Sequence, residues 1–227
     1  MTPISLIASH LGPDGDATEL DAMFRDWEAW CADVFESHSS FPMLVLWRSK
    51  HRGHSWVTAL GVVTDAAIDY MACFPGAERG PALRLYRQSV RLITFLAART
   101  GIEAPEYVRP SPRGWSLGYS AFSGLGYELR TFDESLSRLH DLRAPFTPLM
   151  EAFIDELLAP RGFWGVTAAD HLAPTGVDEM LGIQPGAPPP EWSTGAADVA
   201  DSMAAQIDEV EHDDAPPDEL EPTPDGD

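Results

Sequence analysis

The chain has 227 residues, 44% of them hydrophobic, and its 15 Lys and Arg against 36 Asp and Glu give a net charge of -21. That length and composition suffice for a domain with a sizeable hydrophobic core. The excess of negative charge argues against a nucleic-acid partner, whose phosphates need Lys and Arg, and against general attraction to anionic lipid.

The negative charge is concentrated at the C-terminal end. Residues 173–227 contain 15 Asp and Glu and no Lys or Arg, so only -6 of the net charge falls on residues 1–172. Nine prolines and few large apolar side chains in the same part predict an acidic, Pro-rich disordered tail over residues 166–227. Within it, Val199, Met203 and Ile207 have helical spacing; they are either stray apolar residues or a short amphipathic helix that docks elsewhere.

Two features of the sequence bear on location. The cysteines, Cys31 and Cys73, lie within apolar helical patterns, which favours free thiols in a reducing compartment. The N-terminus lacks a signal-peptide pattern, and the apolar stretch 56–74 is interrupted by Asp65 and Asp69, short of the ~18 residues of a membrane helix. We therefore expect a cytoplasmic domain without direct membrane insertion.

The first predicted helix begins near residue 16. Residues 1–15 are punctuated by Pro and Gly and are predicted to be a lead-in linker. Asp16 and Glu19 have the spacing of a capping box, in which an acidic side chain accepts the first free N–H groups. The apolar residues that follow recur at helical steps up to Pro42 and predict one continuous apolar face. They are Leu20, Met23, Phe24, Trp27, Trp30, Cys31, Val34 and Phe35.

The later predicted helices are bounded by Pro and Gly. One helix over residues 55–73 stops at a Pro-Gly pair, and the next, over residues 81–101, starts at a Pro and ends at a Gly. Two shorter helices are predicted over residues 133–143 and from Pro148 onward. We expect an all-α fold, an antiparallel bundle of about five helices, in a domain that covers residues 16–165.

Three segments between these helices are less regular. Residues 43–47 are compatible with a short helical or an extended piece, and residues 102–114 hold three prolines and are predicted to be a loop. Residues 115–130 mix aromatic residues with glycines and favour no single element.

Sequence motifs for catalysis or cofactor binding are absent. The run GLGYEL at residues 124–129 lacks the third glycine of a dinucleotide-binding loop and a preceding strand, and GYSAF at residues 118–122 lacks the closing glycine of a nucleophile elbow. No Walker A loop, HExxH or paired-Cys pattern occurs. We therefore expect no cofactor and no catalytic residue; an enzyme using Glu36, His38 and His51 for acid–base chemistry is a less favoured alternative.

The basic run RSKHRGHSW at residues 48–56 has three interpretations. In the favoured one, Arg48 pairs with a carboxylate such as Glu36 or Asp65, Ser55 caps the following helix and Trp56 packs into the core. In the second, Arg48, Arg52 and the N–H groups before Ser55 bind a small anion.

A metal site is the third interpretation of this run. His51 and His54 could combine with Glu36, His38, Asp65 or Asp69, all of which carry metal-ligating atoms. The neighbouring arginines would repel a divalent cation, so we expect no metal.

Arg84, Arg87 and Arg91 form a basic stripe along one face of the predicted helix over residues 81–101. The stripe could bind an acidic partner, including the tail of the chain itself. The favoured interpretation is that the stripe pairs with the acidic face of the first helix or is solvated, and single exposed ion pairs contribute only ~0.2–1 kcal/mol.

Three segments resemble the cytoplasmic C-terminal helical domain of bacterial two-transmembrane, potassium- or ion-channel-type proteins. They are ISLIASHLG, WEAWCADVFESHSSFPMLVLWRSKHRGHSWVTALGVVTDAA and LRAPFTPLMEAFIDELL, within residues 3–165. The family pattern combines a Trp-rich helix, a Glu-Ser-His turn, an Arg-Ser-x-His-x-x-x-Ser-Trp segment, a later Asp, and a Leu-Arg followed by an aromatic residue. The matching residues here are Trp27, Trp30, Glu36, His38, Arg48, Ser49, His51, Ser55, Trp56, Asp65, Leu142, Arg143 and Phe146.

The resemblance implies a regulatory or assembly role beside a channel pore. The pore helices and filter of the family are not part of this sequence, its Arg-Gly-His before Ser55 is less polar than the family pattern, and its acidic tail is not part of that pattern. We therefore expect a non-enzymatic homo-oligomer that acts with a membrane pore on another chain or segment. The alternative is a small-molecule-binding protein with a pocket between the Trp-rich helix and the helix after Trp56.

Overall fold

The computed structural model describes residues 2–12, 15–46, 55–109, 111–124 and 126–159. The described residues form seven α-helices and two short 3-10 helices without strands, which confirms the all-α class. The elements in chain order are α1 (Pro3–His10), α2 (Thr18–Ser40), η2 (Pro42–Leu46), α3 (Trp56–Cys73), η3 (Ala77–Arg79), α4 (Pro81–Thr100), α5 (Pro112–Gly124), α6 (Phe132–Arg143) and α7 (Thr147–Leu157).

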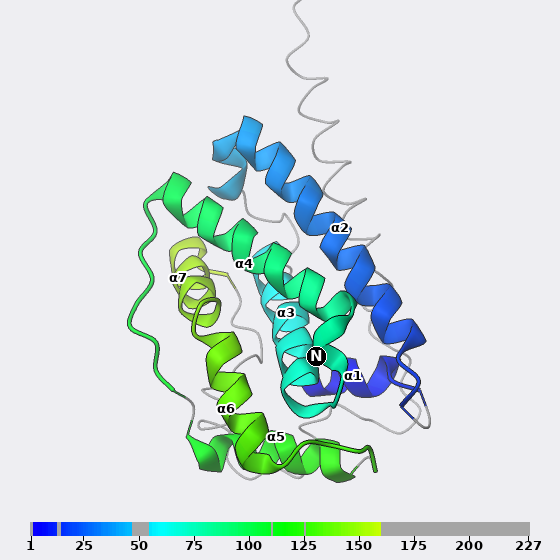
Figure 1. Cartoon of the computed structure of the whole chain (residues 1–227). Coiled ribbons are helices and arrows are strands. Elements are labelled where there is room, and N and C mark those ends of the chain that lie inside the picture. Colours follow the sequence, from blue (N-terminus) through cyan, green and yellow to red (C-terminus); the bar gives the residue numbers. More distant parts are fainter. Residues whose placement is uncertain (1, 13–14, 47–54, 110, 125, 160–227) are drawn as a thin grey trace, which may run out of the picture.

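Helix α3 lies at the centre of the bundle. It packs against α1, α4, α6 and α7, and Figure 1 shows it enclosed between α2 and α4 on one side and α6 and α7 on the other. Of its residues, only Thr58, Ala59 and Tyr70 are not buried. This burial explains why residues 56–74 are mostly apolar, with Asp65 and Asp69 as the charged exceptions.

The helices around α3 follow an up-and-down order. His38 near the end of α2 contacts Trp56 at the start of α3, whereas Phe24 contacts Tyr70, so α2 and α3 are antiparallel. Helices α2 and α4 pack side by side in the same direction (Figure 1), as the contact of Phe35 with Phe95 and the pair of Glu28 with Arg84 show.

Helix α1 corrects the predicted linker over residues 1–15. Thr2 accepts a hydrogen bond from the Ser5 amide at 3.1 Å, and the Ser5 hydroxyl completes a capping box with the Thr2 amide at 2.9 Å. The proline at position 3 occupies the first turn, where its missing N–H costs nothing. Buried Ile4 and Ile7 then place α1 in the core, so the bundle begins before residue 16.

Helix α5 occupies part of the segment that the sequence left unassigned. Trp115, Ala121 and Phe122 are buried, and α5 packs against α1 and α6. At Gly118 a β-carbon would lie 3.3 Å from Cδ1 of Ile4, so the glycine allows α1 and α5 to approach closely. Gly118, one of the glycines that obscured the helical pattern, therefore serves the packing of the helix.

The predicted capping box at the start of α2 is wrong. The N-cap is Ala17, and Oδ1 of Asp16 accepts hydrogen bonds from the amide and the hydroxyl of Thr18, at 3.0 and 2.6 Å. Helix α2 therefore begins at Thr18, two residues after Asp16. Glu19 lies in the first turn of α2 rather than at the position where it would complete a capping box.

Some predictions lie outside the described residues. Among them are the predictions on residues 48–54 of the basic run, the last six positions of the predicted bundle domain, the predicted tail over residues 166–227, and Val199, Met203 and Ile207 within it. In the described part of the chain, no helix has the length and apolar character needed to cross a membrane.

Candidate functional site

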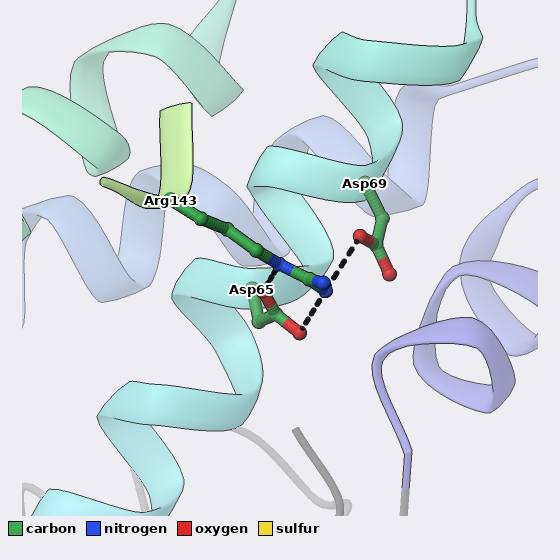
Figure 2. Close-up of polar contacts among 3 residues, drawn as sticks. All are labelled: Asp65, Asp69 and Arg143. Carbon is green, nitrogen blue, oxygen red and sulfur yellow. Dashed lines mark hydrogen bonds and ion pairs between the residues drawn. The ribbon is translucent and has the colours of Figure 1, made fainter. Parts of the chain in front are cut away.

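Two carboxylates lie inside the core on the central helix. Asp65 and Asp69 are one turn apart on α3, which places them on the same face, and each is 2% exposed. Arg143, the last residue of α6, extends between them and is equally buried (Figure 2). We call these three residues the core ion cluster.

The geometry of the core ion cluster is that of a strong, bidentate pair. Arg143 donates from Nε to Oδ1 of Asp65 and from Nη2 to Oδ2 of Asp65, both at 2.7 Å (Figure 2). Nη2 also donates to Oδ1 of Asp69 at 3.1 Å. Two parallel charge-assisted bonds fix the guanidinium plane, so the cluster ties the end of α6 to the middle of α3.

The core ion cluster contains one guanidinium and two carboxyl groups. This imbalance of charge determines which carboxyl group keeps its proton. Burial and the neighbouring Asp65 carboxylate raise the pKa of Asp69 well above its ordinary value, and Arg143 only partly opposes this. Burial alone would lower the pKa of Arg143, but Asp65 and Asp69 outweigh it and raise that pKa. Arg143 therefore stays charged against Asp65, while Asp69 retains a proton to higher pH than an ordinary aspartate.

Further polar groups surround the cluster from a loop and a second helix. Burial raises the pKa of Tyr107, and Arg143 and Asp65 are close enough to shift it in opposite directions. Burial, together with Arg109 and Arg143, lowers the pKa of His140. Neither the Tyr107 hydroxyl nor Nη1 of Arg143 has a hydrogen-bond partner among the described residues, although both atoms are buried.

An aromatic cluster forms where α2 ends and α3 begins. The ring centroids of Trp27 and Trp30 are 5.1 Å apart, those of Trp30 and Trp56 are 6.4 Å apart, and those of His38 and Trp56 are 6.2 Å apart. These four rings, which we call the Trp–His cluster, are all buried. Burial lowers the pKa of His38, so its imidazole is neutral at physiological pH.

The structure divides the predicted site residues between these two clusters. His38 and Trp56 meet at the start of α3, while Asp65 lies nine residues further, about 13 Å along the helix axis. Glu36 is exposed on α2 and belongs to neither cluster. Arg48 and His51 lie outside the described residues.

Ser55 departs in part from its predicted role. It occupies the N-cap position of α3 with an extended backbone, but its side chain makes no capping hydrogen bond. The start of α3 is held instead by the burial of Trp56 and Val57.

Arg84 and Arg91 of the basic stripe on α4 contact α2. Arg84 pairs with Glu28 at 2.9 Å, with half of its side chain exposed. The Arg91 guanidinium lies 4.6 Å from the centre of the Phe35 ring, a cation–π contact. Arg87 is exposed.

The sequence presented Asp69 as an interruption of the apolar stretch and as a possible metal ligand, but not as a partner of Asp65 and Arg143. Two acids spaced i, i+4 in an otherwise apolar helix are a signal for a buried polar site. Tyr107, which lies close to the core ion cluster, falls in a segment predicted only as a loop. Arg143 entered through the resemblance alone, because nothing local links it to Asp65, 78 residues earlier.

Within the described ranges, no three or more His, Cys, Asp or Glu side chains gather so that they could hold a metal ion. No protein-family model, curated protein or solved structure matches the chain. The core ion cluster, the Trp–His cluster and the surfaces around them are therefore the candidate functional sites among the described residues.

We predict that Asp69→Asn flattens the pH dependence of stability. Because the pKa of Asp69 is raised in the folded protein, the folded state binds more protons than the unfolded state above pH ~4, and stability falls as pH rises through the folded pKa. Each unit of upward shift removes about 1.4 kcal/mol at high pH, and asparagine has no such proton to lose. Urea unfolding at a series of pH values measures this.

The matched control for this experiment is Asp26→Asn, at an exposed position on α2. It should retain the pH dependence of the wild-type protein. A steeper loss of stability with rising pH in Asp69→Asn than in the wild-type protein would contradict the protonation assigned to Asp69.

Proposed function

We propose that the chain is a non-enzymatic helical domain that assembles or regulates an ion channel of the bacterial two-transmembrane type. The observation that carries the proposal is the bidentate pair of Asp65 and Arg143. Both residues belong to the pattern that resembles the channel-associated domain, and they lie 78 residues apart in the chain. Their contact favours the interpretation of the pattern as one three-dimensional unit rather than as scattered similarities.

The Trp–His cluster supports the same proposal. Trp27, Trp30, His38 and Trp56 also belong to the pattern, and their rings form one buried group. Pattern residues that are buried against one another favour a role in holding the domain's shape. A domain of fixed shape suits a partner of fixed symmetry, such as a pore built from identical subunits.

The experiment that tests this proposal is the solution mass of the full chain by light scattering, from low to high micromolar concentration. One chain has a mass of 24.8 kDa. We expect a stable dimer or tetramer, because a domain that follows channel symmetry associates with itself. A monomer at every concentration would count against the assembly role.

A second candidate function is the binding of a small molecule beside the Trp–His cluster. It is favoured by Nε2 of His38, a buried nitrogen with no hydrogen-bond partner among the described residues. Buried polar atoms normally have a partner, and large aromatic side chains with one or two polar groups are typical of ligand pockets. Native mass spectrometry of the purified chain would show a stoichiometric ligand, and its absence from His38→Leu but not from Ser39→Ala, at an exposed position of α2, would support this function.

A further inference from the structure

Helix α4 carries a positively charged face that contrasts with the rest of the chain. The helix contains four arginines and no Asp or Glu, although the net charge of the chain is -21. Arg84, Arg87 and Arg91 follow the i, i+3, i+7 spacing of one helical stripe, and all three are exposed. We call these three residues the α4 arginine stripe.

The described part of the chain neutralises this stripe only partly. Glu28 on α2 pairs with Arg84 at 2.9 Å, and half of the Arg84 side chain remains exposed. Arg91 lies over the Phe35 ring, a contact that leaves its charge in place. For Arg87, the described residues provide no ion pair and no ring contact. Asp21 on α2 is also close enough to Arg84 for the two charges to interact. Neither acid pairs with Arg87 or Arg91 among the described residues, so the face remains able to bind an anionic partner.

The chain itself contains a segment of matching charge. Residues 208–221, DEVEHDDAPPDELE, hold eight acidic residues in 14 positions and no Lys or Arg. We propose that residues 208–221 dock on the α4 arginine stripe of the same molecule. The occupant is a segment of this chain, because an external polyanion would have to approach a molecule of strongly negative net charge.

The length of the chain permits this contact. The last described residue, Ala159, follows α7, and α7 packs against α4. The 49 residues from there to Asp208 can span at most ~160 Å, whereas α4 is about 30 Å long. Covalent attachment also gives the acidic segment an effective concentration of the order of millimolar, which compensates for the weakness of single exposed ion pairs.

Site-directed photo-crosslinking of the full chain tests the proposal. Ala215→Cys places a single reactive thiol in the acidic segment for a benzophenone maleimide. Cys31 and Cys73 are buried, and burial raises the pKa of Cys31 to about 12 and raises that of Cys73 as well, so the folded protein directs the label to the new cysteine. Crosslinked peptides are then located by mass spectrometry.

We expect crosslinks in peptides that span residues 84–91. Their yield should fall about fivefold or more in high salt, because screening weakens several exposed pairs at once. The variant Arg87→Gln with Arg91→Gln should reduce the yield similarly, since both positions are exposed and the Arg84–Glu28 pair is retained. Arg113→Gln, at an exposed arginine of α5, is the matched control and should leave the yield unchanged.

Three results would overturn the proposal. The first is a set of crosslinks without preference for residues 84–91, and the second is a yield that is unaffected by salt and by the Arg87 and Arg91 substitutions. The third comes from an equimolar mixture of isotope-labelled and unlabelled chains: mixed-label crosslinks that approach the share expected for random pairing, about half of the total, would assign the contact to neighbouring molecules, whereas a contact within one molecule gives almost none.

Discussion

Replacing Arg143 by methionine is expected to lower the free energy of unfolding by about 3–5 kcal/mol. The change removes the two 2.7 Å hydrogen bonds that Arg143 donates to the Asp65 carboxylate, which is 2% exposed. Removing the charged partner of a buried carboxylate costs far more than the loss of a surface pair, because water does not replace the missing partner. Denaturant unfolding followed by circular dichroism measures the loss.

The control for Arg143→Met lies on the same helix. Arg138 is 3.9 Å from Glu78 and 39% of its side chain is exposed, so Arg138→Met should cost less than about 1 kcal/mol. Adding Asp65→Asn to Arg143→Met should recover part of the lost stability, because the buried carboxylate is then uncharged. A stability of Arg143→Met close to that of the wild-type protein would show that the core ion cluster is not a structural tie.

The second large effect is expected from Trp30→Ala, which should lower the free energy of unfolding by about 3–5 kcal/mol. Trp30 is 4% exposed and its ring packs between those of Trp27 and Trp56. Removing it leaves a cavity where α2 meets α3, and the helices can close that cavity only in part. The same denaturant unfolding assay applies.

Phe41→Ala is the matched control for the tryptophan variant, because it truncates another aromatic residue close to the end of α2. Phe41 is 66% exposed, so its loss should change stability by no more than about 0.5 kcal/mol. If Trp30→Ala is as mild as this control and yet abolishes a copurified ligand, the Trp–His cluster forms a pocket, and the second candidate function is favoured over assembly.

The sequence alone was sufficient to predict the helices that have strong apolar periodicity and clear signals at their ends. The helices predicted over residues 55–73 and 81–101 are observed as α3 at Trp56–Cys73 and α4 at Pro81–Thr100. A Pro-Gly pair follows the end of α3, and Pro81 begins α4. The C-cap of α4 is Gly101 in the left-handed conformation that glycine adopts at least cost.

The helices that the prediction missed are those in which local signals conflict. Helix α1 has only eight residues, and the Pro and Gly around it suggested a linker. Its stability comes from burial of Ile4 and Ile7 against the other helices, which no local pattern reveals. In α5, Gly114 and Gly118 lower helix propensity, and the reason for Gly118 appears only in its close packing against Ile4.

The sequence allowed single residues of the candidate site to be predicted, but not the contacts that those residues make with one another. Asp65 was recognised as a candidate, and Trp56 was expected in the core, where it lies. The partner of Asp65 comes from another helix, and contacts across 78 residues are set by the tertiary fold. The burial that raises the pKa of Asp69 is likewise a property of the assembled bundle.

The most direct test of the proposed role is ion flux through a chimaeric channel. The full chain would replace the C-terminal region of a bacterial two-transmembrane channel-type protein, and potassium flux from liposomes would be compared with that of the parent protein and of its pore alone. We predict that the chimaera restores the flux of the parent and that Arg143→Met abolishes the restoration. Flux equal to that of the pore alone, with and without the substitution, would contradict a channel-associated role.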